Sequence, residues 1–111
     1  MSNIETRLAE LRELAGVFAK AQAQRCYLEE FKKSKLAMGM KKYEKAGHKT
    51  SAAQEREALA DPDYIGILEG LKDATEQAEK ARWELKIAEM GASLYQTQQA
   101  NQRAERKAYG A

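Results

Sequence analysis

The fold is decided by one connecting stretch, KAGHKTSAAQEREALADPDY, at residues 45–64. This stretch contains Gly47 and the only proline of the chain, Pro62, and it separates two much longer segments with helical spacing of apolar residues. Glycine tolerates the left-handed conformation that often follows a helix, and proline is favoured at the first helical position. The sequence therefore predicts one helix that ends near Gly47 and another that begins at Pro62.

The same stretch predicts a short helix of its own. Ser51 followed by Gln54 has the form of a capping box, in which the two side chains satisfy reciprocal backbone donors. This helix should end near Ala60, because the residue before a proline is disfavoured in the helical conformation. Asp61 is then the expected N-cap of the next helix, with Pro62 at its first position. We predict a single helical domain over residues 1–111, with helices at about 3–46, 51–60 and 62–108.

Two long apolar stripes predict how these helices pair. One runs from Ile4 to Phe18 and continues less regularly beyond it, and the other runs from Tyr64 to Tyr95, each with apolar residues three or four positions apart. Gly39 is expected to mark a weak point or a bend, because glycine costs about 1 kcal/mol inside a helix. Segments of similar length can pair side by side. We predict an all-α fold in which two long antiparallel helices form a hairpin with the short helix in the connection.

A second apolar stripe on the last segment predicts self-association. It consists of Trp83, Ile87, Met90 and Leu94 and is offset around the helix from the first stripe. One partner helix cannot cover both stripes, so we expect another subunit to cover the second one. The composition agrees with this expectation, because aromatic residues make up only 7% of the chain and a lone copy could bury only a thin core. The fold is therefore predicted to assemble as a homo-oligomer.

The sequence offers little for catalysis or for metal binding. His48 is the sole histidine and Cys26 the sole cysteine, so neither a histidine cluster nor an intramolecular disulfide can form. One cysteine and one histidine are enough for a Cys26 and His48 nucleophile pair, but Cys26 lies in a segment whose apolar residues have helical spacing. The chain contains no glycine-rich phosphate-binding loop of the Walker type. We predict a protein that is not an enzyme and that holds no cofactor and no metal.

The expected compartment is the cytoplasm. A single cysteine suits a reducing environment. The N-terminus begins with polar Ser2 and Asn3 rather than an apolar signal-peptide core, and no segment approaches the roughly 18 apolar residues of a membrane span. We therefore expect no membrane association.

Charge is distributed unevenly along the chain. Residues 25–50 contain eight basic and three acidic residues, a net charge of +5, whereas residues 51–80 contain three basic and eight acidic residues, a net charge of −5. The basic stretch could neutralise phosphates, and two aromatic rings within it could stack on bases. A lysine-rich helix is also commonly just a solvated face. The candidate nucleic-acid-binding residues are Lys32, Lys33, Lys35, Lys41, Lys42, Tyr43, Lys45, His48 and Lys49.

The order of features in the second half of the chain resembles a known family. Lys-Lys-Tyr-Glu-Lys at residues 41–45 is followed by Lys49-Thr50, then by a long helix with Arg82, Trp83 and Lys86, and finally by Gln-Gln-Ala-Asn-Gln-Arg at residues 98–103. This order is similar to that of small helical phage recombination proteins related to the UvsY recombination mediators. The resemblance covers roughly residues 22–106 and implies a bacteriophage protein that acts in the host cytoplasm.

The resemblance also implies an activity. Proteins of that family bind single-stranded DNA as a ring-shaped oligomer, displace single-strand-binding protein and help load a recombinase. By resemblance, Lys41, Lys42, Lys45, His48 and Lys49 occupy the basic segment here. The chain is shorter than the best-known mediator and lacks part of its N-terminal region. No residue of this chain can be matched to a recombinase contact.

Two hypotheses follow from the sequence. The first is a recombination mediator that binds single-stranded DNA as an oligomer and helps load a recombinase or annealing protein. The second is a phage protein-interaction module, either an inhibitor of a host defence complex or an assembly factor, which does not bind nucleic acid. In the second, the acidic stretch and the stripe from Trp83 to Leu94 would bind the partner, and the lysines would only increase solubility.

Overall fold

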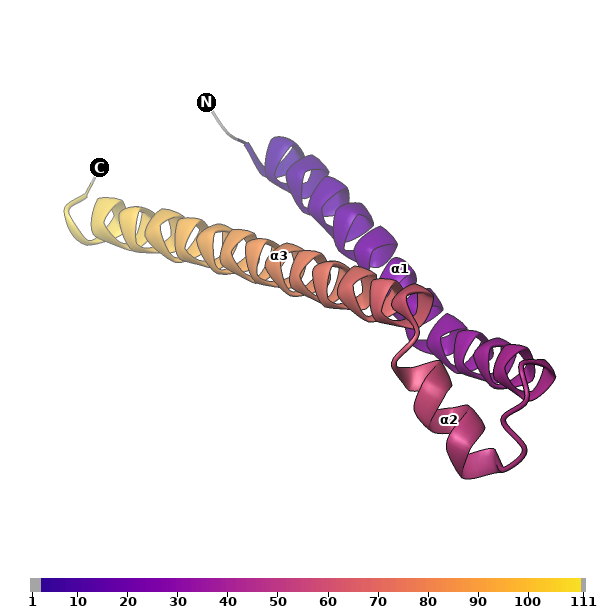
Figure 1. Ribbon diagram of the computed structural model, residues 1–111. Helices are drawn as coiled ribbons and strands as arrows, with labels where there is room; N and C mark the ends of the chain where they lie inside the picture. Colours follow the sequence, from indigo (N-terminus) through magenta and orange to yellow (C-terminus); the bar gives the residue numbers. More distant parts are fainter. Residues whose placement is uncertain (1–2, 111) are drawn as a thin grey trace. The chain divides into compact units, whose positions relative to one another are not determined.

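The computed structural model describes residues 3–110, which form three α-helices and no β-strand (Figure 1). Helix α1 spans Ile4–Lys45, α2 spans Ser51–Leu59 and α3 spans Pro62–Ala108. The all-α prediction is confirmed. The predicted domain also included residues 1, 2 and 111, which lie outside the described residues.

The described residues belong to two compact units, and both long helices contribute to each. The connector unit, residues 19–79, contains the C-terminal part of α1, all of α2 and the first part of α3. The terminal unit combines the chain up to residue 18 with the chain from residue 80 onward. The long helices contact each other within both units. In the terminal unit the Arg7 guanidinium lies 4.1 Å from the centre of the Tyr95 ring, and in the connector unit Lys35 Nζ lies 3.9 Å from Asp63 Oδ2.

The less exposed residues of both long helices recur with a period of 3.5 residues. Their spacing alternates between three and four, apart from the last step of the α1 series from Gly39 to Tyr43, and this alternation is typical of helices that pack as left-handed coiled coils. The series of α3 contains Tyr64, Ile67, Leu71, Ala74, Ala78, Ala81, Leu85, Ala88, Ala92, Tyr95 and Gln99. The series of α1 contains Arg7, Leu11, Leu14, Phe18, Ala21, Arg25, Leu28, Lys32, Lys35, Gly39 and Tyr43.

The first two predicted members of the α1 stripe, Ile4 and Leu8, lie outside this series. Ile4 and Leu8 are 58% and 46% exposed, whereas Leu11 and Leu14 are half-buried. The reason is geometric, because the 3.5-residue period places Arg7 rather than Leu8 in line with Leu11. The Arg7 side chain packs on Tyr95 at that point. The packed face of α1 therefore begins at Arg7 rather than at Ile4, where the apolar residues begin.

The core is thin and consists mainly of alanine. The buried apolar residues among the described ones are Ala58, Tyr64, Ala74, Ala78 and Ala81, and none of them belongs to α1. An alanine side chain buries little apolar surface, and each Å² of buried apolar surface stabilises the fold by only roughly 25 cal/mol. Hydrophobic burial within one copy of the chain is therefore modest.

The end of α1 follows from Gly47. This residue has a φ of 110°, the left-handed conformation that glycine adopts without strain. The Gly47 N–H donates to the Glu44 carbonyl at 3.1 Å, and the His48 N–H donates to the Tyr43 carbonyl at 3.0 Å. This pair of hydrogen bonds is the Schellman arrangement, which satisfies the last carbonyl groups of a helix. The predicted helix stop is confirmed.

Helix α2 begins at residue 51 as predicted, but its N-cap differs from the prediction by one residue. Thr50, not Ser51, is the N-cap, because Thr50 has an extended backbone and its hydroxyl accepts from the Ala53 N–H at 3.1 Å. The Gln54 side chain does not complete a capping box. Its amide donates to the His48 carbonyl at 2.9 Å and so fixes the connection before the helix. Both Thr50 and Ser51 can cap a helix, and only the backbone conformation selects between them.

Gly39 allows two helices to approach closely. Helix α1 continues through it, so the expected weak point is not a break. A Cβ atom placed on Gly39 would lie 3.0 Å from the Cβ of Ala58 and 3.5 Å from its Cα. The first distance is shorter than an ordinary carbon contact of about 3.5 to 4.0 Å. Glycine is therefore needed here because α2 packs against α1 at this point.

Substituting alanine for glycine at two positions tests this role. Gly66→Ala should raise the free energy of unfolding by about 1 kcal/mol, because alanine is the better helix former and no atom lies within 4 Å of the new Cβ. Gly39→Ala should instead lower it by about 1 kcal/mol, because overpacking against Ala58 outweighs that gain. Urea denaturation at one fixed protein concentration measures both. Equal stabilisation by the two variants would contradict the close approach at Gly39.

Candidate nucleic-acid interface

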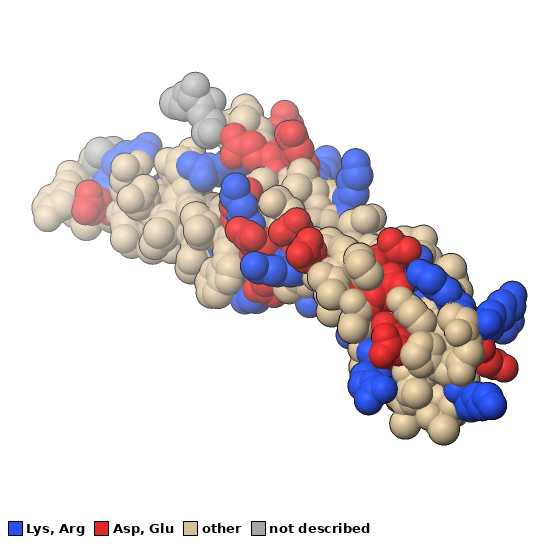
Figure 2. Space-filling model, viewed as in Figure 1, with Lys and Arg blue, Asp and Glu red and all other residues tan. Residues whose placement is uncertain are grey.

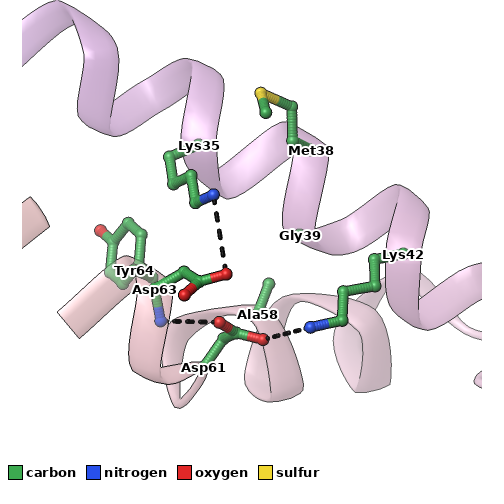
Figure 3. A pocket seen from close by; sticks show the side chains of 8 residues that line it. All are labelled: Lys35, Met38, Gly39, Lys42, Ala58, Asp61, Asp63 and Tyr64. Atoms are coloured by element: carbon green, nitrogen blue, oxygen red, sulfur yellow. Dashed lines mark hydrogen bonds and ion pairs between the residues drawn. The ribbon is translucent and has the colours of Figure 1, made fainter. Parts of the chain in front are cut away.

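The connector unit is organised around the carboxylate of Asp61. This side chain is only 7% exposed. Its Oδ1 accepts from the Asp63 N–H at 2.8 Å, which caps α3 as the sequence predicts. Its Oδ2 accepts from the Tyr43 hydroxyl at 2.7 Å and from Lys42 Nζ at 3.0 Å. Figure 3 shows the bonds to Lys42 and Asp63. One carboxylate therefore holds the end of α1 against the start of α3.

The protonation states of these three side chains depend on one another. The hydrogen bond from Tyr43, followed by those from Lys42 and the Asp63 backbone, lowers the pKa of Asp61 from 3.8 to about 2. The hydrogen bond to Asp61 in turn raises the pKa of Lys42 and the pKa of Tyr43. At neutral pH the cluster therefore consists of a carboxylate, an ammonium group and a neutral phenol.

A second ion pair lies beside this cluster. Lys35 and Asp63 approach to 3.9 Å across a shallow pocket that Gly39, Ala58 and Tyr64 also line (Figure 3). The four charged side chains of the pocket form two pairs, because Lys42 binds Asp61. Each of these charges has a partner within the protein, and we interpret the pocket as a packing feature of the connection.

Several of the predicted nucleic-acid-binding residues have structural contacts of this kind. Lys35 and Lys42 form the two ion pairs described above, and Lys33 pairs with Glu30 at 3.2 Å. The Tyr43 ring is half-buried and meets the His48 ring edge-on, with ring centres 5.8 Å apart. Both residues are half-buried and contact each other, so less of each ring is open to a stacked base.

Three predicted residues remain exposed and unpaired. Lys41, Lys45 and Lys49 form no ion pair or hydrogen bond with the described part of the chain. Lys41 and Lys45 are one helical turn apart on α1, and Lys49 lies in the connection that follows. Lys32 also lacks an ion pair within residues 3–110, but it is half-buried. In Figure 2, basic side chains project around this end of the connector unit, with acidic ones between them.

The charge asymmetry of the sequence is largely neutralised within the connector unit. Residues 19–79 contain eleven basic and eleven acidic residues, so their net charge is zero. The basic stretch of α1 and the acidic start of α3 belong to the same unit, and two ion pairs link them. The charge asymmetry therefore partly serves to pair α1 with α3 within this unit. Only the lysines without an ion pair remain as a candidate nucleic-acid interface.

The predicted oligomer interface lies in the terminal unit and is exposed. Trp83, Ile87, Met90 and Leu94 are 51%, 60%, 56% and 65% exposed. The Arg82 guanidinium lies 5.2 Å from the centre of the Trp83 ring, and Lys86 Nζ lies 5.0 Å from it. A contiguous exposed apolar face of this kind commonly marks an interaction surface.

Two further findings concern the described residues as a whole. Residues 3–110 bring no three His, Cys, Asp or Glu side chains together in a way that could hold a metal ion. Among the described helices, none combines the length and the hydrophobicity needed to cross a membrane.

Comparisons with known proteins add no assignment. No protein-family model matches the chain, and it has no match among the curated proteins or the solved structures.

Sequence reasoning identified Asp61 only as a helix cap and missed its bonds to α1. A signal was present, because the net charges of residues 25–50 and 51–80 are equal and opposite. That equality could have suggested that the two stretches pair with each other. It could not have shown that Lys35 and Lys42 are the lysines involved, since this depends on how α1 and α3 meet.

Removing the charge of Asp61 tests its role as the anchor of the connection. Asp61→Asn should lower the melting temperature at pH 7 by several degrees, because the neutral amide keeps an acceptor for the Asp63 N–H but loses the charged bonds to Tyr43 and Lys42. The folded-state pKa is depressed, so this stabilisation is complete above about pH 4 and is lost as the pH falls through about 2.

The lowered pKa of Asp61 also predicts how the effect of Asp61→Asn on melting temperature changes with pH. The difference in melting temperature between wild type and Asp61→Asn should shrink from pH 4 to pH 2. Asp73→Asn is the matched control, because Asp73 is exposed and forms no ion pair within residues 3–110. If both variants melt like the wild type at pH 7, Asp61 does not anchor the connection.

Proposed function

We propose that this protein is not an enzyme but binds single-stranded DNA as an oligomer and helps load a recombinase or annealing protein. The observation that carries the DNA-binding part is the set of exposed, unpaired lysines at the turn from α1 to α2: Lys41, Lys45 and Lys49. The resemblance to phage recombination mediators supports the loading role. Single-strand-binding protein and a recombinase are the protein partners that this role requires.

The lysines suit contacts with phosphate. Lys41, Lys45 and Lys49 do not have to break an internal ion pair before they meet a nucleic-acid backbone. The neighbouring Lys42 and Tyr43 hold the end of α1 on Asp61, so the exposed lysines project from a structured connection. Three lysines per chain give only weak binding. In an oligomer they are repeated in every copy, and a strand that touches several copies binds far more tightly.

Assembly is the second part of the proposal. We infer that α1 and α3 form a long antiparallel hairpin and that several hairpins associate, a ring included. The alanine-rich core buries little apolar surface, while four large apolar side chains of α3 stay exposed. Covering Trp83, Ile87, Met90 and Leu94 with another subunit would add the hydrophobic burial that one copy lacks.

A protein-interaction module is the competing function, and the same exposed face of α3 favours it. If Trp83 and its neighbours bind a host protein, then the lysines are only a solvated surface. Affinity capture from a host lysate treated with nuclease separates the two functions. A directly bound protein survives the nuclease treatment, whereas a partner bridged by DNA is lost.

Removing the three lysines tests DNA binding. The triple variant Lys41→Ala, Lys45→Ala, Lys49→Ala should lose most of its affinity for a labelled single-stranded oligonucleotide in fluorescence anisotropy at low salt. The slope of log affinity against log salt should also fall by about 2 per bound subunit, at roughly 0.7 per phosphate contact on a single strand.

A control of equal charge separates local contact from net charge. Lys20→Ala, Lys72→Ala, Lys107→Ala removes the same three charges from exposed positions elsewhere. This variant should bind DNA nearly as well as the wild type. Equal losses in the two triple variants would show a net-charge effect only, and no binding by the wild type at low salt would refute the DNA-binding proposal.

A single charge in the exposed apolar face tests assembly. Trp83→Asp should reduce the oligomer mass in light scattering at micromolar concentration, because a carboxylate would be buried in the subunit contact. Val17→Asp is the control, since Val17 is exposed to a similar degree, 50%, but lies on α1. A wild-type protein that is strictly monomeric would contradict the assembly proposal.

A further inference from the structure

Helix α3 has two apolar faces on nearly opposite sides in the terminal unit. The inner face includes Leu85, Ala88, Ala92 and Tyr95, which are half-buried, and Tyr95 meets Arg7 of α1. The outer face consists of Trp83, Ile87, Met90 and Leu94. At 3.5 residues per turn its centre lies roughly 150° around the helix from the centre of the inner face. Helix α1 therefore cannot reach the outer face within the terminal unit.

The outer face has the spacing of a coiled-coil seam. Its four members are separated by four, three and four residues, which is the same alternation that the inner face shows. A partner that fits this spacing is another helix with a matching period, because knobs from one helix enter holes in the other every 3.5 residues. A second copy of α3 supplies such a helix.

Charge is distributed along this face in a way that selects the direction of the partner. The position before Trp83 in the series is Lys80, and the position after Leu94 is Thr97. The residues at the edges of the seam follow the same trend: Glu84 and Lys86 flank its first half, and Gly91 and Ser93 flank its second half. The first half is therefore charged at its edges and the second half is not.

We propose that two copies of the chain pair through their outer faces, with the two α3 helices antiparallel about a two-fold axis between Ile87 and Met90. In this register Trp83 packs on the partner's Leu94, and Ile87 packs on the partner's Met90. Lys80 then lies opposite the partner's Thr97, so the charged half of each seam meets the uncharged half of the other. A parallel pair in register would instead place Lys80 against the partner's Lys80, a like-charge contact that destabilises.

The pairing is isologous, since each copy contributes the same surface, and such a contact closes as a dimer. It deepens the assembly part of the proposed function and rests on it. Within a larger oligomer, the dimer would be the building block, and each copy would contribute its own Lys41, Lys45 and Lys49.

Disulfide trapping tests the register. In a Cys26→Ser background, which removes the exposed native thiol, an affinity-tagged Ile87→Cys chain is mixed with an untagged Met90→Cys chain and oxidised. The antiparallel register predicts that the mixed 87 to 90 disulfide predominates over the two same-residue products. Predominant 87 to 87 and 90 to 90 products, or no crosslinked dimer, would overturn the pairing. Oxidation of the wild-type chain, with its thiol on α1, gives the background level.

Substituting charged residues at Thr97 and Lys80 gives a second test, which leaves the apolar face intact. Thr97→Lys should weaken dimerisation about four-fold, because it places a second cation opposite Lys80 at two symmetric points, each changing affinity by about two-fold. Thr97→Glu should strengthen dimerisation to a similar extent. Adding Lys80→Glu to Thr97→Lys should restore the wild-type affinity. Sedimentation velocity over a range of concentrations measures all four proteins, and equal effects of Thr97→Lys and Thr97→Glu would overturn the register.

The possible failures are distinguishable. A wild-type protein that is monomeric in light scattering refutes the assembly proposal together with the pairing. An oligomer that yields no mixed disulfide refutes only the antiparallel pairing. The role of the lysines is measured separately, as the loss of DNA binding in the Lys41, Lys45 and Lys49 variant by anisotropy, and a monomeric protein would bind the strand more weakly but through the same lysines.

Discussion

The connector unit depends on the carboxylate of Asp61. Where α1 ends and α3 begins, this one side chain accepts hydrogen bonds from three groups: the Tyr43 hydroxyl, Lys42 Nζ and the Asp63 N–H. The side chain is almost inaccessible to water, so its charge must be satisfied by the protein. The position of α2 follows from this constraint, because the short helix spans the space between the two anchored ends and touches α1 at Gly39.

The same constraint changes the meaning of the charge pattern. A stretch of net charge +5 next to one of −5 suggests a basic surface and an acidic surface for two different partners. Within residues 19–79 the two stretches instead neutralise each other, and Lys35 and Lys42 are used in that pairing. The candidate interface is smaller as a result, but it is better defined: Lys41, Lys45 and Lys49 are presented by a connection whose conformation the neighbouring residues hold.

Assembly is connected to the composition of the core. The inner face of α3 includes many alanines, which allow close packing but bury little surface, and four large apolar side chains of the terminal part of α3 lie on its other face. A chain with this distribution gains hydrophobic burial mainly by association. If the outer faces pair, folding and assembly are coupled, and the stability of the protein depends on its concentration.

The sequence by itself determined the helices and their limits. Gly47, Asp61 and Pro62 act through local backbone preferences, so the stop of α1 and the start of α3 could be predicted from a few residues each. The apolar spacing also predicted the inner face of α3 and its exposed second stripe. Even the local choice between Thr50 and Ser51 as N-cap, however, depended on a backbone conformation that the sequence leaves open.

Only the tertiary structure decided which lysines are structural and why Gly39 is a glycine. Both depend on contacts between residues about twenty positions or more apart, namely Lys42 with Asp61, Lys35 with Asp63 and Gly39 with Ala58. Helical periodicity determines which residues share a face of one helix, but it does not determine which residues of another helix meet that face. The physical reason is that the meeting point depends on how the connection between the helices folds, and this is determined by packing and hydrogen bonding in three dimensions.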